Sequence, residues 1–152
     1  MENVTVLGAG SWGTALAIVL AENGHNTFLW THREDQAAEI NNSHTNKQYL
    51  PTTVLPTNLR ATASLEEAVA HAKTIVVAVP TKAIREVCSN VSNLLNETKL
   101  FVHVSKGIEP DTLLRISELM KESIKPQYIE EIVVLSGPSH AEEVVLQHPT
   151  TV

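Results

Sequence analysis

The feature that most limits what this chain can fold into is a glycine-rich turn in its opening stretch, MENVTVLGAGSWG. The run VTVL is β-branched and apolar, as is typical of a buried strand, and Gly8, Gly10 and Gly13 follow it with G-x-G-x-x-G spacing. The Ala- and Leu-rich segment 14–23 then predicts a helix that ends at Gly24. Strand, turn and helix in this order predict a dinucleotide-binding unit.

Each of the three glycines has a different expected role. Gly8 allows a tight reversal, Gly10 allows the backbone to approach a pyrophosphate, and Gly13 allows the helix to pack close to the strand. The N–H groups that open the helix lack intrahelical partners, and the helix dipole adds positive potential there. We therefore expect a dinucleotide pyrophosphate at this turn, with a merely connecting glycine turn as the alternative.

Size and charge exclude several classes of protein. A chain of 152 residues predicts one domain with one ordinary core. A net charge of −6 gives no general attraction to nucleic acid or to an anionic membrane, so neither is an expected partner. We see no signal peptide and no apolar run of about 18 residues, the length that a membrane span needs.

Cysteine and histidine usage points to a cytoplasmic protein without a metal. The single cysteine, Cys88, lies in the helical pattern AIREVCSNV and is expected to be a buried structural thiol, which fits a reducing cytoplasm. The seven histidines form no H-x-x-x-H or Cys/His cluster, so no metal site is predicted.

Strand and helix patterns alternate along the chain. This predicts an α/β fold of the Rossmann type: a doubly wound, mainly parallel sheet with helices on both faces. Further strands are expected at 27–31, 59–62, 73–80, 99–104 and 132–135. Further helices are expected at 34–41, after Ser64 with a capping box to Glu67, at 82–95 with Thr81 as cap, from Pro110, and after Ser139 with a second box to Glu142.

The end of the second predicted strand bears on the choice of coenzyme. An NAD site usually has Asp or Glu there, whereas this chain has Thr31, His32 and Arg33. A guanidinium can hold a 2′-phosphate through two parallel hydrogen bonds, so NADP is favoured without excluding NAD. The alternatives are that Arg33 is only a solvated residue and that Glu34 or Asp35, which look like first-turn helix charges, reaches a ribose.

Three further positions are candidates for the ligand crevice at the carboxyl ends of the strands. Residues 79–81 should lie beside the pyrophosphate or the nicotinamide ribose and make backbone contacts. Tyr49 has equal grounds for covering a cofactor ring and for simple packing. Lys106, before a glycine at a strand end, would neutralise a phosphate or polarise a carbonyl; a solvated loop lysine is the alternative.

Five stretches together closely resemble the bacterial type of NAD(P)-dependent glycerol-3-phosphate dehydrogenase: GAGSWGTALA, LWTHR, VAVP, VSKGIE and LSGPSHAEEV. The resemblance covers the whole chain but only the family's amino-terminal domain, and its specific parts are SKGIE and SGPSHAEE. It implies contacts to the coenzyme from Ser11, Trp12, His32, Arg33, Tyr49, Lys106 and Ala141. It implies contacts to glycerol 3-phosphate from Lys106, Gly137 and Ser139.

The implied reaction is reversible hydride transfer between NAD(P)H and dihydroxyacetone phosphate, giving sn-glycerol 3-phosphate for phospholipid synthesis. The family's proton-transfer lysine belongs to a carboxyl-terminal helical substrate domain, so we expect no catalytic residue in 1–152, a dinucleotide-binding domain inactive alone, and a homodimer when full length. The final HPTTV looks like the approach to a seventh strand. Two alternatives remain: another two-domain dehydrogenase of the 3-hydroxyacid or 6-phosphogluconate type, and a non-catalytic NADP-sensing module.

Overall fold

A six-stranded parallel sheet with the strand order β3-β2-β1-β4-β5-β6 organises the chain. The computed structural model describes residues 1–136 and 140–149. The strands are β1 (Asn3–Leu7), β2 (Asn26–Trp30), β3 (Leu59–Thr62), β4 (Thr74–Val77), β5 (Lys99–His103) and β6 (Ile129–Val134). The helices are α1 (Ser11–Glu22), α2 (Glu34–Ser43), α3 (Leu65–His71), α4 (Thr81–Leu94), α5 (Ile116–Ser123) and α6 (Ala141–Val145), with a 3-10 turn η1 (Pro126–Tyr128) before β6.

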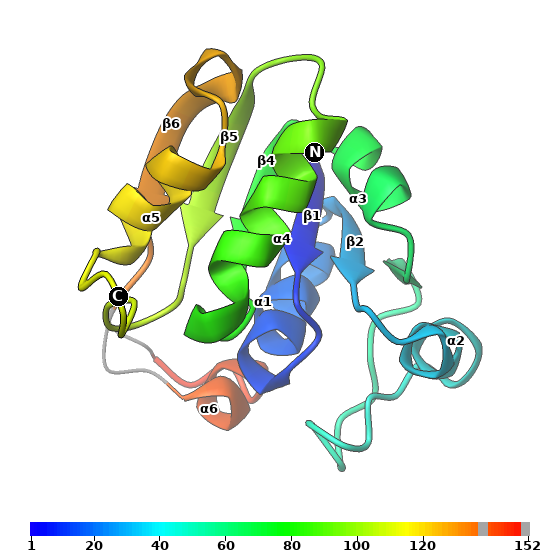
Figure 1. Ribbon diagram of the computed structural model, residues 1–152. Helices are drawn as coiled ribbons and strands as arrows, with labels where there is room; N and C mark the ends of the chain where they lie inside the picture. The colour runs from blue at the N-terminus through cyan, green and yellow to red at the C-terminus, as the bar shows by residue number, and fades with distance from the viewer. Residues whose placement is uncertain (137–139, 150–152) are drawn as a thin grey trace.

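Helices cover both faces of the sheet, which confirms the predicted doubly wound α/β fold. Figure 1 shows α4 and α5 in front of the sheet and α1 behind it. One core layer joins α3, α4 and α5 to strand residues such as Ile75 and Phe101, and the other joins α1 and α2 to Val6 and Leu29. Strands buried on both faces are expected to be apolar almost throughout, as β1 and β4 are.

The order of the strands reverses between β1 and β4, because the chain builds outward from β1 to β3 and then returns to β4 on the other side. Such a reversal leaves a crevice outside the carboxyl ends of these strands, where parallel α/β sheets bind their ligands. The glycine-rich turn lies at this place, since it follows β1 directly.

The helix predicted from Pro110 exists, but its predicted start is wrong. Residues 109–115 form a turn in which the Leu113 N–H donates to the Glu109 carbonyl at 2.8 Å, and Leu113 has a left-handed φ of 59°. The helix α5 begins only at Ile116, where the preceding Arg115 N–H donates to the carboxylate of Glu118 at 3.2 Å. A side chain three residues into the helix therefore sets its start.

Two predicted helix caps also differ from the structure. The Ser64 hydroxyl accepts from the Glu67 N–H at 3.2 Å, but the Glu67 carboxylate binds the hydroxyl of Thr62 rather than closing the box. Thr81 is the first residue of α4 instead of its cap, and its hydroxyl donates to the Lys106 carbonyl at 3.2 Å. The second predicted box involves Ser139, which lies outside the described residues.

The single thiol is structural, as predicted. Cys88 lies on α4 with 1% of its surface exposed, and burial raises its pKa to about 12. A thiol with this pKa is protonated and unreactive at neutral pH. No helix within the described ranges is both long and apolar enough to cross a bilayer.

Candidate functional site

The glycine turn between β1 and α1 is shaped by two close backbone approaches. Gly8 has a φ of 112°, and a Cβ built on it would lie 2.7 Å from the carbonyl oxygen of Ala78. A Cβ on Gly13 would lie 1.9 Å from the carbonyl oxygen of Gly8. Side chains at these two positions would collide with the backbone, so Gly8 and Gly13 are required by packing within the protein.

Gly10 has a different environment from its two neighbours. A Cβ built on it would meet no described atom within 4 Å, and its φ of −77° suits any residue. Internal packing therefore gives no reason for a glycine here. Gly10 is the N-cap of α1, which has neither a side-chain cap nor an acidic residue in its first turn. The open space thus lies in front of free N–H groups and an uncompensated helix dipole, a fit for a pyrophosphate.

A cleft of about 440 Å³ runs along the carboxyl ends of β2, β1, β4 and β5. From β2 to β5 it crosses three strand spacings, about 14 Å. Nine predicted coenzyme-site residues line it: Gly8, Gly10, Ser11, Trp12, Gly13, His32, Arg33, Tyr49 and Lys106. The corner 79–81 lines it too, as expected from strand order. Within the described residues, no group of three or more His, Cys, Asp or Glu is placed to hold a metal ion.

Of the other three predicted residues, one lies away from the cleft and two lie outside the described residues. Ala141 is buried at the start of α6, a helix that contacts α1, and is not in the lining of the cleft. Gly137 and Ser139 lie outside the described residues.

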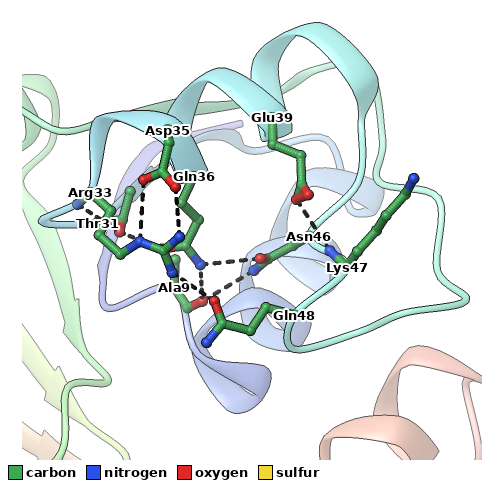
Figure 2. Close-up of polar contacts among 9 residues, drawn as sticks. All are labelled: Ala9, Thr31, Arg33, Asp35, Gln36, Glu39, Asn46, Lys47 and Gln48. Carbon is green, nitrogen blue, oxygen red and sulfur yellow. Dashed lines mark hydrogen bonds and ion pairs between the residues drawn. The ribbon is translucent and has the colours of Figure 1, made fainter.

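A buried polar network fixes the glycine turn from behind. The side-chain amides of Gln36 and Asn46 both donate to the carbonyl of Ala9, at 2.8 and 3.1 Å. Figure 2 shows these two amides converging on Ala9 from α2 and from the segment that follows it. Asn46 also donates to the Thr14 hydroxyl at 2.9 Å, and the Thr31 hydroxyl donates to Gln36 at 2.5 Å. All four side chains are buried, so the network holds β2, α2 and the turn in one arrangement.

We did not identify Gln36 and Asn46 from the sequence. Gln36 carried a usable signal, because it lies four residues before Ile40 and therefore on the apolar face of α2, where a polar side chain needs a buried partner. Asn46 lies in irregular chain without periodicity, and only the tertiary structure places it behind the turn.

Replacing Asn46 by Ala should destabilise the protein by about 2 kcal/mol and weaken its affinity for a dinucleotide. The change removes three hydrogen bonds and leaves buried partners unsatisfied. Chemical denaturation and coenzyme titration measure the two effects. Asn58→Ala is the matched control, because Asn58 makes a 2.9 Å bond to the Ala21 carbonyl away from the cleft. Equal losses from both variants would contradict a special role for Asn46.

One end of the cleft, at the tip of β2, carries Arg33 in a defined orientation. Its Nε and Nη2 donate to the two carboxylate oxygens of Asp35 at 3.2 and 2.7 Å, and its Nη1 donates to Gln48 at 2.6 Å. The pairing raises the pKa of Arg33 and lowers the pKa of Asp35, mainly through these hydrogen bonds. Glu34 and Asp35 occupy the first turn of α2, as predicted.

The other end of the cleft carries Lys106, exposed on the segment after β5. Several contacts fix this segment. The Ser105 hydroxyl donates to the Val79 carbonyl at 3.0 Å, and Arg85 on α4 binds both carboxylate oxygens of Glu109 at 2.8 and 3.0 Å. The guanidinium of Arg85 lowers the pKa of Glu109 to about 2, so this pair stays ionised at neutral pH. Lys106 therefore lies on a loop that these hydrogen bonds and the Arg85–Glu109 ion pair hold in place.

Comparison with known proteins matches this chain to one family. Residues 3–152 fit the family described as NAD-dependent glycerol-3-phosphate dehydrogenase N-terminus. A protein of Lysinibacillus sphaericus named glycerol-3-phosphate dehydrogenase [NAD(P)+] is 70% identical over all 152 residues, which are 45% of its length. A Bacillus subtilis protein with the same name is 57% identical over the whole chain and 44% of its own length.

A solved structure of the same family matches the fold of this chain. Glycerol-3-phosphate dehydrogenase from Coxiella burnetii superimposes with a TM-score of 0.89 at 32% identity, covering 98% of this chain and 45% of that one. The chain thus spans less than half the length of these relatives.

Proposed function

Because this chain belongs to the NAD-dependent glycerol-3-phosphate dehydrogenase family, whose amino-terminal part it matches, we propose that it is the coenzyme-binding domain of such an enzyme. The enzyme would transfer hydride between NAD(P)H and dihydroxyacetone phosphate, giving sn-glycerol 3-phosphate for glycerophospholipid synthesis. The observation that carries this proposal is the space in front of Gly10, which no packing requirement explains and which faces the uncapped start of α1. That space suits a close anionic ligand.

In this proposal the ends of the cleft bind different parts of the coenzyme. The first turn of α1, with Ser11 and Trp12, receives the pyrophosphate through its backbone N–H groups. The tip of β2, with His32 and Arg33, receives the adenosine, and Tyr49 covers it from the side. The guanidinium of Arg33 at this tip favours NADP, although its pairing with Asp35 lessens that preference and the relatives are named for both coenzymes.

The substrate would lie at the β5 end. Lys106 would neutralise the phosphate or polarise the carbonyl of dihydroxyacetone phosphate, because it lines the cleft and carries a positive charge. By the family resemblance, Gly137 and Ser139 would complete the substrate contacts, whereas Ala141 lies buried outside the lining of the cleft. A bound nicotinamide coenzyme supplies the hydride. We place the proton-transfer lysine in a carboxyl-terminal helical domain of the enzyme, by the family resemblance.

We also propose a homodimer that works in the cytoplasm without a nucleic-acid partner. The single cysteine is a buried, protonated thiol suited to a reducing compartment, and a net charge of −6 gives no attraction to nucleic acid. The homodimer is implied by the family resemblance.

Titrating the chain with NADPH, NADH and glycerol 3-phosphate tests the proposed function. Both tryptophans line the cleft, so coenzyme binding should change their fluorescence. Lys106→Ala should weaken glycerol 3-phosphate binding in the presence of coenzyme by about tenfold, because one charge-assisted hydrogen bond is lost. Lys121→Ala, an exposed lysine on α5, controls for net charge. An NADP-sensing module would bind coenzyme and lose nothing on the Lys106 change.

A further inference from the structure

The guanidinium of Arg33 is already engaged within the protein. Asp35 binds it along one edge through Nε and Nη2, and Gln48 accepts from Nη1 on another side. Figure 2 shows the carboxylate of Asp35 lying directly against the guanidinium, with Gln48 approaching from the segment after α2. The Arg33 and Asp35 side chains are 38% and 72% exposed, so solvent and ligands reach the pair.

A bidentate guanidinium edge is the usual recognition element for a phosphate. In this chain that edge is held by Asp35. A 2′-phosphate at the tip of β2 would have to displace the carboxylate and would then lie close to its negative charge. A ribose hydroxyl requires neither, because it is neutral and needs only one partner. The internal pair therefore opposes one coenzyme and leaves the other unaffected.

We propose that Asp35 lowers the preference of this site for NADPH over NADH by holding the donors of Arg33 that a 2′-phosphate would take. This inference rests on the proposed function, since it concerns the coenzyme of the same site. Asp35 is a specificity-determining residue that acts through Arg33. Because Asp35 pairs with Arg33, the end of β2 does not carry the free cation that Arg33 suggested in the sequence.

The remaining charges near the tip do not replace Asp35. Glu34 shares the first turn of α2, but within the described part of the chain its carboxylate makes no ion pair with Arg33. The carboxylate of Glu39 accepts from the backbone N–H of Lys47 at 3.2 Å, and its charge raises the pKa of Arg33 less than the contact with Asp35 does. His32 is exposed beside Arg33 and carries no negative charge. Asp35 is thus the acidic group in contact with the guanidinium.

The test is the ratio of NADPH and NADH affinities of the chain, measured by tryptophan fluorescence. Asp35→Asn keeps the shape of the side chain and removes its charge. We expect it to raise the preference for NADPH about twofold to fivefold, the upper part of the range of an exposed ion pair. Glu34→Gln removes the same charge from the same helical turn and should change the ratio by less than about twofold. In Arg33→Gln the Asp35 substitution should have no further effect on the ratio.

The outcomes separate the possible roles of Asp35. Equal shifts from Asp35→Asn and Glu34→Gln would mean that only net charge matters, which overturns the inference. Parallel weakening of both coenzymes, with the ratio unchanged, would mean that Asp35 merely supports the fold, which also overturns it. If the unmodified chain binds neither coenzyme, the proposed function itself fails and the inference fails with it.

Discussion

A Gly10→Val variant is expected to fold normally and to lose coenzyme binding. A Cβ built at this position meets no described atom within 4 Å, and the backbone has a φ of −77° that valine adopts without strain. The cost in stability should be about 1 kcal/mol or less, the difference between glycine and a β-branched residue at an N-cap. The new methyl groups would occupy the space in front of the first turn of α1, from which a pyrophosphate must accept hydrogen bonds.

The expected loss of affinity for NADPH and NADH is about 100-fold, the equivalent of one or two charge-assisted hydrogen bonds. Fluorescence titration measures the affinity, and denaturant unfolding of the same sample measures the stability. Both coenzymes should weaken alike, because they share the pyrophosphate. Unchanged binding in a folded Gly10→Val variant would show that the ligand does not approach this turn, and the proposed function would fall.

A Gly13→Ala variant is expected to show the opposite behaviour, with a large loss of stability. Its Cβ would lie 1.9 Å from the Gly8 carbonyl oxygen and 3.2 Å from the Cβ of Ala78. Helix α1 would have to move away from β4, and we expect a cost of about 3 kcal/mol or more. For a domain of this size the midpoint of thermal unfolding should fall by about 6–12 °C.

Whether Gly13→Ala raises or lowers the stability of the protein shows whether the backbone packs closely at this residue. Glycine to alanine inside a helix ordinarily stabilises by about 1 kcal/mol, because alanine is the better helix former. Gly13 lies within α1, so a loss of stability can come only from the close approach of the backbone. Gly10→Ala is the matched control, with the same added methyl group and no contact within 4 Å. If Gly13→Ala were as stable as this control, the tight packing of the turn would be refuted.

Together these variants separate two reasons for glycine within one motif. Gly8 and Gly13 serve the protein, since other backbone atoms occupy the space that a side chain would need. For Gly10 we propose that the glycine serves a ligand, since a Cβ there would meet no described atom within 4 Å and the residue borders the cleft. The spacing of the glycines does not show which of them is required by packing, whereas the distances from a Cβ built on each glycine do.

The alternation of strands and helices was readable from the chain because it depends on local periodicity and burial. All six strands were predicted near their observed positions, including β3 at Leu59–Thr62 without an error. The strand predicted at 73–80 ends early, at Val77, because the next residues turn away to cover the glycine turn. The helix predicted from Pro110 begins six residues late, at Ile116, because the Arg85 contact to Glu109 and the left-handed Leu113 hold the preceding segment in a turn.

The glycine spacing and the alternation of strands and helices by themselves predicted which edge of the sheet would carry the ligand cleft, since in a parallel sheet every strand has its carboxyl end at the same edge. Only the tertiary structure shows which polar contacts support that edge of the sheet and which charges there are paired. Gln36 and Asn46 meet behind the turn from separate segments, and Asp35 turns back on Arg33. A sequence specifies local conformation and burial through short-range preferences, but the pairing of polar side chains depends on which surfaces the folded chain brings within about 3 Å.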